Sequence, residues 1–326
     1  MNRRLLLGAI LRKLVFAGCL VFLVTSGSLL VTHLAPGDAT TELRRPGVSD
    51  DTIARQRERL GLERPFAVQY VDWMAGAMRL DLGRSSRYGR PVLELLGERV
   101  RNTALLATAA LAVATVLGVG LGVAAGHWVS GAVPWVIGAA SIIAVSVPSL
   151  LASLLLALVA ARTGWFPVGG MTSVGFEGLG WAARLGDVAW HLTLPAVAVA
   201  IPLVGTIERL QSQALSETLA MPYVRAAVAR GLSRGRIVWG HALPVAIRPV
   251  LGVYGIIVGS VFSGSFVVEV VTAWPGLGQL MYEALVSRDT NLVAGCALAG
   301  ASCLALGNMA ADIALVAADP RLRTES

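Results

Sequence analysis

The chain has 326 residues, of which 55% are hydrophobic and only 14% are charged, and its mean hydropathy is +0.69. This small charged fraction cannot solvate the surface of a soluble protein of this length. The composition therefore indicates one polytopic membrane domain. The net charge is +7, from 27 Lys and Arg against 20 Asp and Glu. In a membrane protein this excess is typical of loops kept in the cytoplasm, and we expect no nucleic-acid partner.

The first apolar run, Leu14–Leu34, follows four basic residues and is long enough to cross a bilayer, which takes about 20 residues. A cleaved signal peptide is the alternative, but the run is long and no small-residue cleavage site ends it. We therefore predict a transmembrane helix over residues 1–34 with a cytoplasmic N-terminus. Residues 35–101 are polar, and this orientation makes them an extracytoplasmic subdomain.

The subdomain is expected to hold two helices. Ser49 can cap a helix with Asp50 and Asp51 in its first turn, and Gly61 is placed to end it. A second helix is expected over residues 65–79. One face of that helix carries four side chains with a mainly apolar surface: Phe66, Tyr70, Trp73 and Ala77.

Five further apolar runs predict six transmembrane helices in all, with both ends of the chain in the cytoplasm. The runs are Thr103–Ala125, Val133–Ala160, His191–Ile207, Val250–Val268 and Asn291–Ala317. Pro148 is expected to kink the third span. Glycines of the second and fifth spans are expected to form faces that neighbouring helices approach closely. They are Gly118, Gly120, Gly122, Gly126, Gly252, Gly255, Gly259 and Gly264.

A polar segment, residues 211–249, separates the fourth and fifth spans. Within it Tyr223–Gly231 predicts a short helix that Gly231 ends, because glycine enters the left-handed region without a steric cost. Ser233 can cap a second short helix. An apolar stripe is expected on the first helix, formed by Val224, Ala227 and Val228. The pattern fits a cytoplasmic helix-turn-helix, and it also fits a solvated basic loop that only sets the topology.

The residues of this segment resemble the cytoplasmic EAA loop of ABC importer permeases. That loop has Glu-Ala-Ala, three residues, Gly and a later Leu-Pro; here Arg225-Ala226-Ala227 precedes Gly231, and Leu243-Pro244 follows. Arginine in place of glutamate resembles the dipeptide, oligopeptide and nickel branch of the family. The resemblance implies a loop that docks on an ATPase subunit. The docking residues it implies are Tyr223, Val224, Arg225, Ala226, Ala227, Arg230, Gly231 and Leu232.

Other stretches are similar to the same family. LAPGD at 34–38 and DLGRS at 81–85 resemble its external subdomain, which lies under a substrate-binding protein; a packed cap without a ligand role is the alternative. DPRLR at 319–323 resembles its closing motif. VEVVTAWPGLG at 268–278 resembles its external re-entrant turn. The residues that this turn implies for an external gate on the binding-protein side are Glu269, Trp274, Pro275, Gly276 and Gly278.

The resemblance implies a type I ABC importer permease fold, all α-helical and integral to the membrane. Residues 102–317 would be the transmembrane type-1 permease domain with its EAA loop at 211–249, and residues 318–326 a cytoplasmic tail. The external subdomain lies between the first two spans.

The chain lacks the residues for its own ATP chemistry. A P-loop needs a lysine after its glycines, and Lys13, the only lysine, precedes the first span. We therefore expect no enzymatic activity and no bound cofactor, with ATP and Mg²⁺ held by partner subunits. The four histidines and three cysteines show no metal-ligand spacing, so no metal site is expected.

These observations predict a permease subunit of an ATP-driven, binding-protein-dependent importer of dipeptides or oligopeptides in the bacterial inner membrane. A nickel or metallophore importer is the alternative substrate class, and a secondary transporter is the alternative transport class. The implied partners are a homologous second permease, two ABC ATPase subunits, an extracytoplasmic substrate-binding protein and the lipid bilayer.

Overall fold

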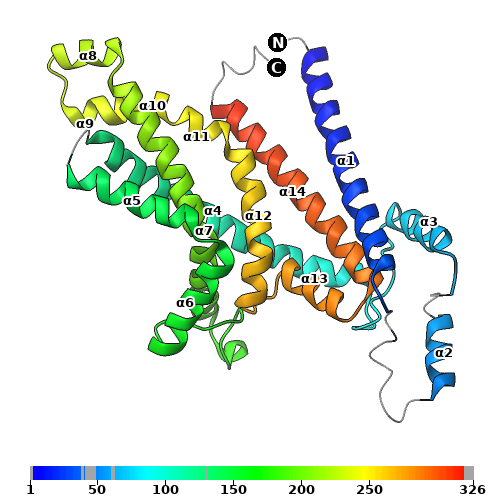
Figure 1. Ribbon diagram of the computed structural model, residues 1–326. Helices are drawn as coiled ribbons and strands as arrows, with labels where there is room; N and C mark the ends of the chain where they lie inside the picture. Colours follow the sequence, from blue (N-terminus) through cyan, green and yellow to red (C-terminus); the bar gives the residue numbers. More distant parts are fainter. Residues whose placement is uncertain (1–2, 38–39, 41–48, 60–62, 129–130, 319–326) are drawn as a thin grey trace. The chain divides into compact units, whose positions relative to one another are not determined.

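A computed structural model describes residues 3–37, 40, 49–59, 63–128 and 131–318, and Figure 1 shows their helices in chain order. The expected end of the first subdomain helix at Gly61 and the motif at 319–323 lie outside the described residues. Within the described ranges the chain is α-helical, apart from loops and one isolated bridge between Arg84 and Pro91. Five helices are long and apolar enough to cross a membrane, or six if one bent pair counts as a span. The prediction of an all-α integral membrane protein is confirmed.

The chain divides into two compact units, which we describe separately. The first unit holds Ala104–Trp274 and the residues from Gly307 on; the second holds the residues up to Thr103 and Pro275–Leu306. The second unit contains α1 (Arg3–Leu34), α2 (Asp50–Arg59), α3 (Phe66–Ala77) and α13 (Leu277–Val286). Two helices contribute to both units, α4 (Val92–His127) and α14 (Thr290–Ala318).

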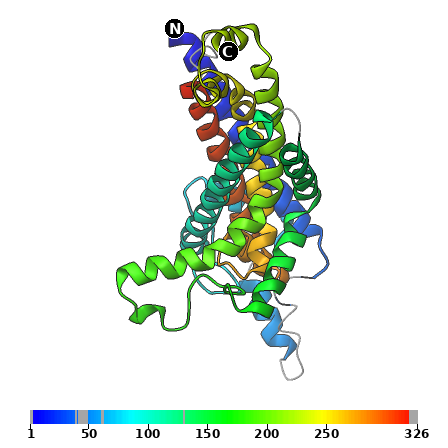
Figure 2. The same ribbon diagram turned by 90° about the vertical axis from the view of Figure 1, so that its left-hand side faces the viewer.

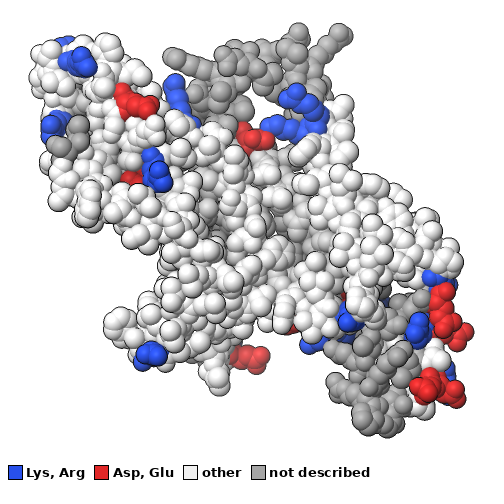
Figure 3. Space-filling view, in the orientation of Figure 1, with Lys and Arg blue, Asp and Glu red and all other residues white. Residues whose placement is uncertain are grey.

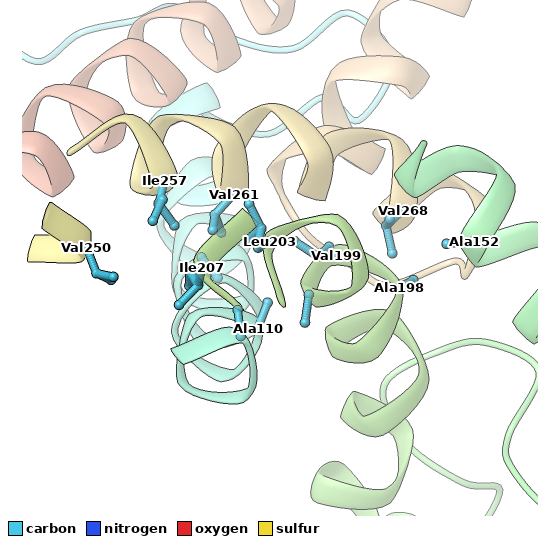
Figure 4. Close-up of a cluster of buried hydrophobic side chains, with 13 residues drawn as sticks. Ala110, Ala152, Ala198, Val199, Leu203, Ile207, Val250, Ile257, Val261 and Val268 are labelled. Atoms are coloured by element: carbon cyan, nitrogen blue, oxygen red, sulfur yellow. The ribbon is translucent and has the colours of Figure 1, made fainter. Parts of the chain in front are cut away.

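The first unit is built around α7 (Trp181–Leu219), which Figure 2 shows from a second direction. It also contains α5 (Ala132–Ser146), α6 (Ser149–Thr163), α8 (Pro222–Ala229), α9 (Arg234–Ile237), α10 (Leu243–Ala246), α11 (Arg248–Gly252) and α12 (Tyr254–Val271). A 3-10 turn, η2, covers Phe176–Gly178, and a π-helical turn, η3, covers Val238–Ala242. The core lies where α4, α6 and α12 pack on α7, and small residues dominate it (Figure 4).

Three glycines of α4 allow its close approach to α7. A Cβ added to Gly118, Gly122 or Gly126 would lie within 3 Å of Ile207, Gln211 or Ser212. Gly120, predicted on the same face, has nothing within 4 Å of its Cβ position, because a residue two further along a helix points to another side. In the fifth span the prediction fits Gly264, whose Cβ would lie 3.1 Å from Ser149 Oγ, whereas Gly252 contacts nothing within 4 Å.

The predicted third span is two helices and not one kinked helix. α5 and α6 meet at an angle of 103°. Pro148 has no N–H to continue the helix and excludes the helical conformation for the residue before it, so Val147 is extended with ψ of 111°. This bend is far larger than the kink that the sequence predicted.

The second unit confirms the predicted helix in residues 65–79, with Pro65 as its N-cap. Its apolar face meets α1: Tyr70 Oη lies 2.8 Å from Ser26 Oγ, and the ring of Phe66 stacks on His33 at 4.4 Å. A loop after α3 is held by Asp289, whose carboxylate accepts a 2.6 Å hydrogen bond from Ser85 Oγ. These contacts make the subdomain a packed structure.

Candidate functional site

The candidate site is the short helix α8 and the turn that follows it, at the far end of α7 (Figures 1 and 2). Pro222 begins α8, where its fixed φ suits the first helical position. Gly231 follows the helix at φ +79°, as predicted. The Gly231 amide donates to Val228 O, and the Leu232 amide donates to Ala227 O. This pair of bonds is the Schellman motif, which satisfies the last carbonyl groups of the helix and needs a left-handed residue.

A small apolar nucleus holds α8 against α9. Val224, Ala227 and Ile237 are buried together, and Leu219 and Leu232 pack on them. Leu232 therefore supplies the hydrophobic contact that accompanies a Schellman turn. The predicted helix-turn-helix is thus a packed element with a core of its own, and it is not an extended solvated loop.

The predicted stripe included one residue that is not buried. Val228 is 58% exposed, because α9 covers only the side of α8 that bears Val224 and Ala227. Tyr223, Arg225, Ala226, Arg230 and Gly231 are exposed as well. We call this set, with Val228, the outer face of α8. Figure 3 shows basic side chains on this part of the molecule.

Two hydrogen bonds tie side chains of this face to the local backbone. Tyr223 Oη donates to His241 O at 3.4 Å, and Arg230 Nε donates to Ala226 O at 3.3 Å. Among the ion pairs of the described residues, none involves Arg225 or Arg230. Their positive charges are therefore available to a partner with acidic groups.

The second short helix of the predicted pair is present as α9, but its predicted cap is not. Ser233 occupies the N-cap position of α9, but its side chain makes no capping hydrogen bond. α9 covers a single turn before the π-helical turn η3 takes over. The backbone between Arg234 and Gly252 then continues through α10 and α11, so several short helices lead back to the next span.

Sequence reasoning missed a buried polar pair at the base of this element. Glu208 and Gln211 are 1% and 0% exposed, on the face of α7 that meets α4. Glu208 Oε2 and both amide atoms of Gln211 have no hydrogen-bond partner among the described residues. The sequence placed Gln211 at the start of a polar loop, but α7 continues to Leu219 and buries it. The sequence signal for this contact was the spacing of Gly118, Gly122 and Gly126 in α4. Glycines four residues apart form a helix face that a neighbouring helix can approach closely.

The predicted external turn begins in the first unit, where it is buried. Glu269 and Trp274 are both 0% exposed, and the Trp274 amide donates to Glu269 O at 2.9 Å. The Trp274 ring packs with Leu106 and Ala196. The backbone turns here through Ala273 at φ 49°. These residues thus shape the turn from within.

The rest of the motif lies in the second unit and begins α13. Asn102 Nδ2 donates to Pro275 O at 2.8 Å, and Thr103 Oγ1 accepts a 2.7 Å bond from the Leu277 amide. Gly276 and Gly278 are buried, and Pro275 is half-buried. Polar side chains of α4 therefore fix the start of α13.

Comparison with known proteins agrees with this architecture. Residues 118–324, which include the α8 element and the turn at 268–278, match the family model described as "Binding-protein-dependent transport system inner membrane component". The chain belongs to this family. Because the family is described as the inner membrane component of a transport system, the chain is the membrane subunit of such a system and not its catalytic part.

Three individual relatives align with nearly the whole length of this chain. It is 32% identical over 317 residues to a "Probable peptide ABC transporter permease protein" of Sinorhizobium fredii, covering 96% of this chain and 98% of the relative. It is 30% identical over 315 residues to the "Oligopeptide transport system permease protein AppB" of Bacillus subtilis, with the same coverage. A "Putative peptide transport system permease protein" of Brucella abortus is 32% identical over 315 residues, again covering 96% and 98%. The predicted family resemblance is confirmed.

Proposed function

We propose that the chain is a permease subunit of an ATP-driven, binding-protein-dependent importer of dipeptides or oligopeptides, in a bacterial cell membrane with both termini in the cytoplasm. The observation that carries this proposal is the outer face of α8, an exposed and positively charged surface on an independently packed element. The names of three relatives, all peptide permeases, support peptides as the substrate class.

The outer face of α8 would be the docking surface for an ATPase subunit. Its geometry suits the transmission of a movement, because the buried nucleus of Val224, Ala227 and Ile237 lets α8 and α9 move as one piece. Only Ala220 and Met221 separate α8 from α7, whose 39 residues continue into the core. A displacement of α8 would therefore tilt α7, which is the step that alternating access requires.

The remaining partners follow from the same proposal. A homologous second permease would complete the pathway, and two ABC ATPases would hold ATP and Mg²⁺. A substrate-binding protein would deliver peptide to the external side, near the turn at 268–278. Since most residues of that turn are buried, they would set its shape, and Pro275 and Ala273 would offer its accessible surface.

The test is reconstitution of the chain with a second permease, two ATPases and a binding protein, taken from any neighbouring genes that encode them. Labelled dipeptides and pentapeptides should enter proteoliposomes only with ATP and the binding protein present, and mass spectrometry of the binding protein should find peptides. A nickel or metallophore complex as its ligand would contradict the peptide assignment. Uptake driven by an ion gradient without ATP would contradict the importer class.

A further inference from the structure

The second unit contains a cavity that the proposed transport function does not use. Its volume is about 810 Å³, which lies within the range of small-molecule sites. It is lined by the end of α1, by α3, by the loop after α3 and by the segment between α13 and α14. Its lining includes aromatic and basic side chains, among them His33, Phe66, Tyr70, Trp73 and Arg288.

The cavity lies at the level where two apolar helices end. His33 is in the last turn of α1, and Thr290 and Asn291 begin α14, and all three line the cavity. Both helices are long and apolar enough to cross a membrane. Their ends mark the boundary between hydrocarbon and water, where lipid headgroups lie and where aromatic side chains gather.

Three carboxylates around the cavity already have partners in the second unit. The Asp289 carboxylate accepts bonds from Ser85 Oγ, Arg87 N and Leu292 N. Asp72 pairs with Arg64 at 3.2 Å, and Asp81 accepts a bond from Gly83 N. With three donors, the buried Asp289 carboxylate has little capacity left for a cationic ligand, and the Arg64 cation balances the charge of Asp72.

Two donors at the cavity are not used. Trp73 is 9% exposed, and its Nε1–H, which can only donate, has no hydrogen-bond partner among the described residues. Arg288 is half-buried, and no ion pair joins it to a described residue. It also has φ of 54°, a left-handed conformation in which glycine is the unstrained residue. An arginine held there lines the cavity with a cation, which a glycine would not supply.

We propose that this cavity binds the phosphodiester headgroup of an anionic phospholipid. A phosphate supplies only acceptors and negative charge, which complements the Trp73 indole N–H and the Arg288 guanidinium. The acyl chains would lie along α1, whose apolar side chains next to the cavity are exposed: Leu30, Val31 and Leu34. This apolar surface favours a lipid over free phosphate as the source of the anion.

Three variants of the full chain test the site by native mass spectrometry in detergent, with phosphatidylglycerol, phosphatidylethanolamine and inorganic phosphate as probes. Arg288→Gly removes the cation and relieves the left-handed backbone, so it should fold. Trp73→Phe keeps an aromatic ring and removes the N–H. Arg79→Gly is the matched control, because Arg79 is exposed and does not line the cavity.

The wild-type chain should retain phosphatidylglycerol in preference to phosphatidylethanolamine. Arg288→Gly should bind it about tenfold more weakly, as expected for a lost charged hydrogen bond. Trp73→Phe should weaken binding by a smaller factor, and Arg79→Gly should leave it unchanged. Equal retention of the two lipids, or an equal loss in the Arg79 variant, would overturn the proposal. Displacement of the lipid by inorganic phosphate would overturn the lipid assignment and identify a soluble anion as the ligand.

Discussion

Gly122 on α4 and Gln211 on α7 are so close that a Cβ on the glycine would lie 2.6 Å from the Gln211 Cβ. The backbone oxygen of Glu208 would be 2.9 Å from the same atom. A hydrogen at Gly122 is therefore what lets the two helices meet, with the buried side chain of Gln211 at the contact. The contact places the end of α7, and thus the base of the α8 element, against a rigid neighbour.

We expect Gly122→Ala to destabilise the protein by roughly 1–3 kcal/mol, because the added methyl group overpacks a backbone contact that cannot yield. Gly120→Ala is the matched control on the same helix, with nothing within 4 Å of its Cβ position. Thermal unfolding of the detergent-solubilised chain measures both. Equal melting temperatures for the two variants would mean that α4 and α7 do not pack as described.

The hydrogen bonds to Asp289 should hold the loop after α3 in a fixed conformation. Asp289 is 1% exposed, and Asp289→Ala leaves Ser85 Oγ and two backbone amides without their acceptor. Each unsatisfied donor costs about 1–3 kcal/mol. Hydrogen exchange at the Arg87 and Leu292 amides should become faster, while the exposed Asp51→Ala serves as control. Unchanged protection of both amides would contradict the bonding described.

Gly231→Ala should impair coupling without preventing insertion. Nothing lies within 4 Å of the Cβ position, so the cost comes from the positive φ alone, about 1–2 kcal/mol. Gly235→Ala is the matched control, also in open space but in a helical turn. At equal membrane levels, Gly231→Ala should lose ATPase association and uptake, and Gly235→Ala should retain both. Normal uptake by the Gly231 variant would show that this turn sets only the membrane topology and has no role in coupling.

Charge on the outer face of α8 should matter for partner binding and not for folding. Arg225 is exposed, so Arg225→Glu should leave the melting temperature unchanged. It should weaken ATPase binding by about 1 kcal/mol, roughly fivefold in Kd, and the difference should shrink at high salt. Arg184→Glu, at the other end of α7, provides the control in a pull-down assay. An equal effect of both variants would argue for a non-specific charge effect.

The two ends of α7 should lie on opposite sides of the membrane. Its 39 residues extend about 58 Å, well beyond the roughly 30 Å of hydrocarbon. In a background without native cysteines, a cysteine at the exposed Val174 should react with an impermeant thiol reagent in intact cells. A cysteine at Ser233 should react only after the cells are opened. Labelling of position 233 from outside would reverse the proposed orientation.

The sequence by itself determined the features that depend on local chemistry. The apolar runs and the EAA-like residues were enough to predict the membrane helices and the family. The stop of α8 at Gly231 was also predictable, because a left-handed residue has the same preference for glycine in any fold. The helix at 65–79 was predictable from its spacing of apolar residues, since one face must be covered.

Only the tertiary structure decided which of these residues are covered, and by what. Local pattern does not reveal that α9 leaves Val228 exposed or that α4 buries Gln211, since both depend on segments distant in sequence. Pro148 predicted a kink but not a bend of 103° between two helices, because the angle depends on what the two helices pack against. The unused donors at Trp73 and Arg288 line one cavity because packing within the second unit brings α1, α3 and the segment before α14 around it.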